Sequence, residues 1–396
     1  MKYNFDKVID RSGTSAEKVE GLKHIWGRTD LIPLWVADMD FATAPFVTDA
    51  IRKRCENEVL GYTGKPDSYY NAIINWVKQR YDLIVTKEVI NFVPGIVPGI
   101  GMAMNCFTQK GDKVMIQPPV YHPFAWVTTR NERTLVINPL KWENGMYRMD
   151  LDAFREQIKG CKLFILCNPH NPGGVVWTEA ELRAIADICY DEKVLVFSDE
   201  IHADLTLPPH THRPFATVCE KARMNSVTFM SPSKAFNMPG LSASHALIFN
   251  EDLRKRFRIY MDAGELDMGH VFAFLSVEAA YSHGTEWLDQ CLAYIQGNID
   301  FVDEFLKKHA PKIKAIRPEA SYLVWLDCRE LELSQKDLNE FFVDKAHLAL
   351  NDGEMFGKEG IGFMRLNVAS PRCIIEKAMK QLADAYQLYI KGTSIN

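Results

Sequence analysis

Features typical of membrane, secreted and nucleic-acid-binding proteins are missing from this sequence of 396 residues. It has no uninterrupted apolar run long enough to cross a bilayer, so we expect no transmembrane helix and no membrane partner. The first residues, Met1 to Asp6, lack the apolar core of a signal peptide. The net charge is −5 and no block of Lys or Arg stands out, so nucleic acid is not an expected partner.

The cysteines do not form a pattern that binds metal or builds a disulfide framework. There are nine, an odd number, and none is part of a Cys-x-x-Cys pair. We expect reduced thiols in the core of a cytoplasmic protein, because several lie among apolar residues: Cys106, Cys161, Cys167 and Cys189. His210 and His212 have no evident third ligand, so we expect a solvated loop there and no metal.

What is present is a large apolar content, 47%, arranged as short apolar runs that alternate with helical segments. Alternation of this kind predicts an α/β fold with a mostly parallel sheet covered on both faces. The strand from His245 to Phe249 follows its neighbour after a loop without a helix, so we expect it to run antiparallel. The expected strands are Lys113 to Gln117, Thr134 to Asn138, Leu163 to Cys167, Val194 to Ser198, Ser226 to Met230 and His245 to Phe249, with a further short strand before Pro94.

From about Gly284 the pattern changes and predicts a second, smaller α+β domain. We expect residues 45–284 to form the large domain, and residues 1–44 and 285–396 to form the small one. The stretch up to Asp40 reads as irregular, and Thr48 to Leu60 reads as a helix. The other elements expected in the small domain are helices at Glu286 to Lys308, Ser334 to Lys345 and Pro371 to Ile390, and strands at Ala320 to Asp327 and Gly362 to Ala369.

Polar residues follow three of the expected strands directly. They are Asn168 to Gly174, Asp199 to Asp204, and Ser231 to Lys234. Parallel strands bring their carboxyl ends to one edge, where such sheets bind ligands, so an Asn, an Asp and a Lys can converge there. A lysine in that place can form a Schiff base with an aldehyde, and Ser231 and Ser233 could hold an anion beside it.

Pyridoxal phosphate requires a set of residues like this one. A lysine holds its aldehyde, and a carboxylate keeps its pyridine nitrogen protonated so that the ring can absorb electrons. The Gly/Pro turn from Phe92 to Gly101 opens an apolar helix whose free N–H groups can cradle a phosphate. Tyr121 also follows a strand and could stack on the ring.

With these motifs together, the chain resembles the fold-type I pyridoxal-phosphate enzymes of the aspartate aminotransferase superfamily over nearly its whole length. Within that group it is most similar to the cystathionine β-lyase or carbon–sulfur lyase branch, the MalY and PatB type. The resemblance implies a seven-stranded sheet, a pyridoxal phosphate cofactor and an amino-acid substrate. It is carried by Trp35 to Phe41, Gly61 to Gly64, Asn168 to Gly174, Ser198 to Asp204, Ser231 to Lys234 and Arg365 to Asn367.

The resemblance also implies roles for single residues. Lys234 would be the Schiff-base lysine and the proton carrier, and Asp199 would pair with the pyridine nitrogen. Asn171 and His202 would contact the phenolic oxygen of the ring, and Tyr121 would stack on it. The backbone N–H groups of Ile96 and Val97, with Ser231 and Ser233, would hold the phosphate. Other members carry a phosphate-binding arginine eight residues after the lysine, where this chain has Ser242.

The substrate and a second subunit are implied in the same way. Arg365 would clamp the α-carboxylate of the substrate bidentately, and the backbone at Val36 and Ala37 would approach the same group. Tyr62 would reach the cofactor of a neighbouring subunit, so that a homodimer is required for activity.

Three functions are compatible with these residues. The first is a carbon–sulfur β-lyase for cystathionine or cysteine-type thioether amino acids, favoured by His202 and the segment from Trp35 to Phe41. The second is an aminotransferase for aromatic or neutral amino acids. The third is a cofactor-bound regulatory protein, against which the set Lys234, Asp199, Asn171 and Arg365 argues.

Overall fold

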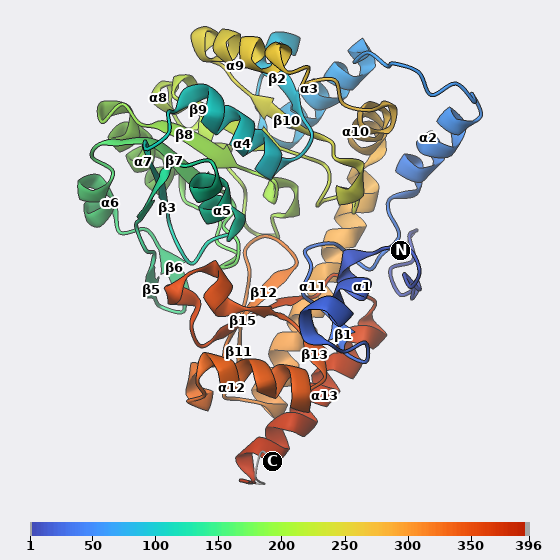
Figure 1. Ribbon diagram of the computed structural model, residues 1–396. Helices are drawn as coiled ribbons and strands as arrows, with labels where there is room; N and C mark the ends of the chain where they lie inside the picture. The colour runs from blue at the N-terminus through green and yellow to red at the C-terminus, as the bar shows by residue number, and fades with distance from the viewer. Residues whose placement is uncertain (1, 393–396) are drawn as a thin grey trace.

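The computed structural model describes residues 2–392, and its upper part in Figure 1 is built on a seven-stranded sheet. In spatial order the strands are β2 (Ile90–Val93), β10 (Ser244–Leu247), β9 (Ser226–Met230), β8 (Leu195–Asp199), β7 (Cys161–Cys167), β3 (Lys113–Ile116) and β4 (Thr134–Ile137). Neighbours from β9 to β4 run parallel, whereas β10 is antiparallel to both β9 and β2. The predicted α/β fold and the antiparallel last strand are therefore confirmed.

Most positions of the strands are buried because helices cover both faces of the sheet. On β7, Leu163 and Ile165 pack on one face and Phe164 and Leu166 on the other. The first face is covered by α4 (Ile96–Phe107), α5 (Pro123–Arg130) and α9 (Glu251–Ala263), and the second by α6 (Leu151–Gln157), α7 (Glu179–Asp191) and α8 (Glu220–Met224). Each parallel strand thus ends at the same edge of a sheet whose faces are closed to water.

Beside the sheet, a layer of three helices leads toward the exposed corner on the right of Figure 1. Helix α10 (Val271–His283) packs against α2 (Pro45–Cys55) and α3 (Asp67–Tyr81). Their contact includes the stacked rings of Trp76 and Tyr281. The segment between α2 and α3 extends from this layer and carries Tyr62.

The lower part of Figure 1 is a smaller α+β unit around an antiparallel sheet. Its strands, in spatial order, are β11 (Lys314–Ile316), β12 (Leu323–Asp327), β15 (Phe363–Asn367) and β14 (Asn351–Asp352). Around them lie α1 (Glu17–Trp26), α11 (Thr285–His309), α12 (Gln335–Glu340) and α13 (Arg372–Ile390), and β1 (Ile32–Pro33) pairs in parallel with β13 (Leu348–Ala349). The boundaries predicted for the two domains, at 44/45 and 284/285, stay a prediction.

The structure differs from the sequence-based expectations at several elements. The helix expected over 48–60 begins at Pro45 and ends at Cys55. The helix expected over 334–345 is an α-helix to Glu340 and then a single π-helical turn over Phe341–Lys345. The hairpin of β5 (Lys141–Glu143) and β6 (Met146–Arg148) was not expected at all.

Helix α1 lies in the stretch that we expected to be irregular. It has little apolar periodicity, since the only residues it buries are Lys18, Gly21 and Leu22. A buried lysine reads as a solvent-facing residue in any hydrophobic pattern, which is why the helix was missed.

The predictions for the cysteines and for the loop with His210 and His212 are confirmed only in part. All nine cysteines are free, and Cys161, Cys167 and Cys189 are buried as expected, whereas Cys106 is only partly buried. His212 is buried and lies 2.8 Å from Glu200, so the prediction of a solvated loop is wrong at this residue. Within residues 2–392, no helix combines the length and the apolar character needed to cross a membrane.

Candidate active site

A cavity of about 200 Å³ opens at the carboxyl ends of β7, β8 and β9. This is the edge at which the polar residues were expected to converge. The predicted site residues that line it are Ala37, Ile96, Val97, Tyr121, Asn171, Asp199, His202, Ser233 and Lys234. The topology therefore brings together residues separated by nearly 200 positions in the chain.

Lys234 is half-buried in the turn that follows β9, and its amine is held by backbone. Its Nζ donates a hydrogen bond to the carbonyl oxygen of Ala37, at 2.6 Å. Burial lowers the pKa of the Lys234 amine to about 8, and the carboxylate of Asp38 offsets part of that effect. A fraction of the amine is therefore neutral near pH 7, as a nucleophile or base requires.

Asp199 ends β8 as a buried carboxylate that forms no ion pair within the described residues. Its Oδ1 accepts a hydrogen bond from the backbone N–H of Ile201, at 3.1 Å. Burial, with a smaller contribution from the charge of Glu200, raises the pKa of Asp199 to about 7. A cationic group placed against this oxygen pair would reverse the shift, so Asp199 is suited to hold a protonated ring nitrogen.

His202, which is buried, and Tyr121, which is half-buried, are polar rings on the walls of the cavity. The Nδ1 atom of His202 has no hydrogen-bond partner within the described residues. Burial lowers the pKa of His202 to about 3, so the imidazole is neutral at pH 7 and can bond a ligand oxygen without charge. Burial raises the pKa of Tyr121, so its ring remains a neutral phenol available for stacking.

The other end of the cavity is suited to an anion. Helix α4 begins at Ile96, so the N–H groups of Ile96 and Val97 lie in its first turn and have no partner within the helix. Ser233 lines the same space, and so do Ser242 and Ser244, which were not predicted. Ser231 does not line it, because its hydroxyl donates to Ala243 and accepts from the backbone N–H of Ser233.

Arg365 adjoins the cavity from β15 and carries a buried guanidinium. Nη1 donates to Asn171 at 3.1 Å, and Nη2 donates to Asn351 at 2.5 Å and to the carbonyl oxygen of Trp35 at 3.0 Å. Every partner is neutral, and burial lowers the pKa of Arg365 to about 10. Among the described residues no carboxylate pairs with Arg365, which leaves its charge available to a carboxylate brought by a ligand.

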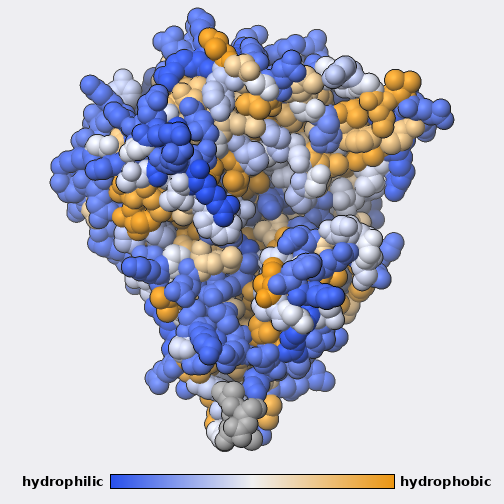
Figure 2. All heavy atoms as spheres, viewed as in Figure 1, coloured by the Kyte–Doolittle hydropathy of each residue, from blue (hydrophilic) through white to orange (hydrophobic). Residues whose placement is uncertain are grey.

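Tyr62 and Val36 lie outside the cavity. Tyr62 is 98% exposed, beside the exposed Val59 and Leu60 on the segment between α2 and α3. Figure 2 shows hydrophobic surface gathered at this corner, over α2 and the chain that follows it. Val36 is held through its carbonyl oxygen by Asn367, at 2.7 Å.

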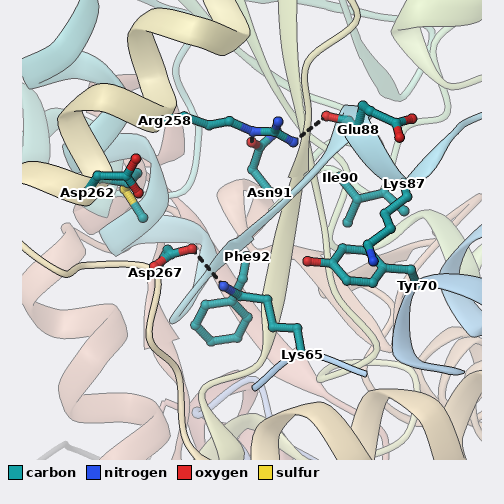
Figure 3. Close-up of a pocket in the computed structure, with 11 residues that line it drawn as sticks. Lys65, Tyr70, Lys87, Glu88, Ile90, Asn91, Phe92, Arg258, Asp262 and Asp267 are labelled. Carbon is teal, nitrogen blue, oxygen red and sulfur yellow. Dashed lines mark hydrogen bonds and ion pairs between the residues drawn. The ribbon is translucent and has the colours of Figure 1, made fainter. Parts of the chain in front are cut away.

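A second hollow, of about 420 Å³, lies at the β2 edge of the sheet and differs in character (Figure 3). Its three cationic side chains already have partners: Lys65 binds Asp267 at 2.6 Å, Lys87 binds Asp67 at 2.6 Å, and Arg258 donates to the carbonyl oxygen of Glu88 at 2.6 Å. The Lys65–Asp267 pair also ties the end of the Tyr62 segment to the chain before α10. We therefore place no catalytic site here.

Two polar residues of the site were not given roles from the sequence. Tyr322 donates to the Ala37 carbonyl oxygen at 3.0 Å, the same atom that receives the Lys234 amine. Asn351 reaches Arg365 from β14. Neither residue belongs to a motif that could be recognised in the sequence. Asn367 does belong to such a motif, because it follows Arg365 by two residues and therefore lies on the same face of β15.

The chain belongs to the aminotransferase class I and II family, whose sequence model matches residues 29–382. It is 38% identical to cystathionine β-lyase PatB from Bacillus subtilis, over 96% of this chain and 99% of that protein. The protein MalY from Escherichia coli is 30% identical, over 97% of this chain and 98% of that one.

Solved structures agree with this assignment. Cystalysin from Treponema denticola, whose crystal structure contains pyridoxal 5′-phosphate, is 33% identical with a TM-score of 0.94, over 98% of this chain and 99% of that one. The pyridoxal-phosphate-bound C–S lyase from Staphylococcus hominis is 36% identical with a TM-score of 0.90, over 97% and 98%. The predicted family resemblance is confirmed.

Proposed function

We propose that this protein is a pyridoxal-phosphate-dependent carbon–sulfur β-lyase. It would cleave cystathionine or cysteine-type thioether amino acids to pyruvate, ammonia and a thiol. The observation that carries the proposal is the convergence of Lys234, Asp199 and Arg365 around one cavity. The similarity to PatB, cystalysin and the staphylococcal C–S lyase supports the lyase branch.

The residues present fit the cofactor. Within the described residues, Asp199 is a buried carboxylate without an ion-pair partner, His202 has an unpartnered Nδ1, and the first turn of α4 offers N–H groups without a partner in the helix. Each lacks the partner that a ring nitrogen, a phenolic oxygen or a phosphate would supply. The chemistry available when pyridoxal phosphate is bound is an aldehyde for an amine and a ring that accepts electrons from the α-carbon.

Lys234 would hold the aldehyde and, once free, would move protons. Its Nζ takes the α-proton of the substrate, which requires the neutral amine that the lowered pKa makes available. Asp199 keeps a proton at the ring nitrogen through its carboxylate. Loss of the β-thiolate and addition of water then convert cystathionine to homocysteine, pyruvate and ammonia.

The substrate would be oriented by Arg365 and Asn171. The guanidinium binds the α-carboxylate, and its bond to Asn171 aligns it with the cavity. Ala37 and Tyr121 line the cavity, so the Ala37 backbone would close the same side, and Tyr121 would cover the cofactor ring and exclude water. A substrate held in this way would have its α-hydrogen within reach of Lys234.

Tyr62 would act in the site of a neighbouring subunit of a homodimer. We expect Tyr62→Ala to lower the activity roughly tenfold or more, which is the usual cost of losing one hydrogen bond to a charged group. Mixing Tyr62→Ala with Lys234→Ala protein should restore about a quarter of wild-type activity, because half of the randomly formed dimers are mixed and each has one complete site. Activity that never exceeds the average of the two unmixed samples would show that Tyr62 does not act across the dimer.

The decisive test is release of pyruvate and free thiol from L-cystathionine with no keto acid added. We expect the two products in equal amounts. If nothing is released, but an aromatic or neutral amino acid turns over once a keto acid is supplied, the protein is an aminotransferase. If neither reaction occurs while the cofactor remains bound, the regulatory alternative gains support.

A further inference from the structure

The segment of residues 34–41, called the strap here, is held by successive hydrogen bonds between β1 and α2. The Trp35 carbonyl oxygen accepts from Arg365, and the Ala37 carbonyl oxygen accepts from Lys234 and Tyr322. The strap is therefore one frame that touches both the substrate clamp and the lysine. Side-chain amides hold it at four further carbonyl oxygens: Asn367 donates to Val36 and Asp38, and Asn237 donates to Met39 and Phe41, at 2.7–3.0 Å.

A cluster of four charged side chains holds the strap from its far side. Lys18, on α1, has a fully buried side chain, and its Nζ lies 2.8 Å from Asp40 and 3.7 Å from Asp38. Arg11 binds Asp38 through both nitrogens, at 2.7 and 3.1 Å, and Asp40 at 3.2 Å. Two cations thus face two carboxylates, and the cluster is neutral overall.

The cluster is coupled to Lys234 both by geometry and by charge. Asp38 adjoins Ala37, whose carbonyl oxygen receives the Lys234 amine. Burial has the largest influence on the pKa of that amine. The carboxylate of Asp38 has the second largest, and it raises this pKa. The other titratable or charged groups that face Lys234 or its carbonyl partner are Asp199, His202, Arg365, Tyr121 and Tyr322.

We propose that Lys18, with Arg11, Asp38 and Asp40, forms a positioning cluster that fixes the Ala37 carbonyl oxygen against the Lys234 amine. The two cations of the cluster also offset the negative charge that Asp38 and Asp40 place near that amine. The proposal rests on the proposed function, because it assigns Lys234 the proton transfer. It gives the N-terminal helix α1 a part in catalysis although none of its side chains lines the cavity.

Removing a positive charge from the cluster and removing a negative charge from it should have opposite effects on Lys234. Lys18→Met leaves an unbalanced carboxylate near the amine, which favours the protonated form of Lys234 and raises its pKa. The acid limb of the kcat–pH profile should then move to higher pH by roughly half a unit to one unit. Asp38→Asn removes a negative charge, so the same limb should move to lower pH.

The pH titration of the visible absorbance of the bound cofactor should shift in the same two directions, and it requires no turnover. Lys23→Met, an exposed lysine on the same helix, is the control and should leave both profiles unchanged. In Lys18→Met, kcat should also fall roughly tenfold with KM little altered, since misplacing a catalytic group mainly slows the chemical step.

Shifts in the same direction for Lys18→Met and Asp38→Asn, or no shift in either, would overturn the proposal in favour of a purely structural cluster. If Lys18→Met does not fold, Arg11→Gln removes a cation from the same cluster at a partly exposed position and should shift both profiles upward. A wild-type protein that binds cofactor but releases no thiol would defeat the proposed function alone, because the absorbance titration would still test the cluster.

Discussion

Replacement of Lys234 by alanine should reduce thiol release from L-cystathionine by roughly 10⁴-fold, the upper range for removing a positioned acid–base group. The half-buried Lys234 amine, with its lowered pKa, adjoins Asp199, whose pKa is raised to about 7. No other lysine lines the cavity among the described residues, so no other amine can take over the proton transfer. Initial rates of thiol release at saturating substrate provide the measurement.

A second measurement separates the two roles of Lys234. Borohydride reduction of the wild-type protein should fix the cofactor to the peptide that contains Lys234, and mass spectrometry of the variant should show no such adduct. Lys380→Ala changes an exposed lysine on α13 and should behave as wild type in both assays. A variant at Lys234 that keeps more than a tenth of wild-type turnover would contradict the assignment.

Replacement of Arg365 by alanine should weaken substrate binding by about 2–5 kcal/mol, the range for removing one partner of a buried charge pair. The expected result is an increase in KM of roughly 30-fold to several thousand-fold. The reason is that this buried guanidinium has only neutral partners within the described chain, so the substrate carboxylate is its one strong counter-charge. Steady-state kinetics over a wide range of L-cystathionine concentrations checks it.

The carboxylate itself supplies the matched control for Arg365. An amide derivative of the substrate cannot form the ion pair, so Arg365→Ala should impair its cleavage much less. Arg155→Ala changes an exposed arginine on α6 and should leave KM unaltered. An unchanged KM in Arg365→Ala protein with a wild-type melting temperature would rule out the clamp.

Much of the fold and of the site could be predicted from local patterns. Continuous apolar runs such as Leu163 to Cys167 indicate strands buried on both faces, because only such strands exclude polar residues from every position. The start of α7 has a local signal of this kind, because Thr178 and Glu181, three residues apart, form a capping box there. The polar residues that follow these strands, including Asp199 and Lys234, are close in space because parallel strands end at one edge.

Other features have no local signal. Lys18 is a buried cation, and nothing in its neighbourhood in the sequence indicates that Asp38 and Asp40 balance its charge. Ser231 resembles Ser233 in the motif, but its hydroxyl is turned to Ala243 by the geometry of the turn. Tyr322 lies in an ordinary apolar strand region and acquires a role only because the strap passes its hydroxyl.

The sequence by itself determined the class of fold, the family and the principal residues that we propose for the cofactor site, because periodicity and motif spacing act over short stretches of chain. Only the tertiary structure decided how Arg365 is supported, which serines face the cavity, and how α1 and the strap meet the Lys234 amine. These arrangements depend on contacts between residues up to about 330 positions apart, such as Trp35 and Arg365. Such contacts form when burial of apolar surface brings distant segments together, and a linear pattern does not record which of them will meet.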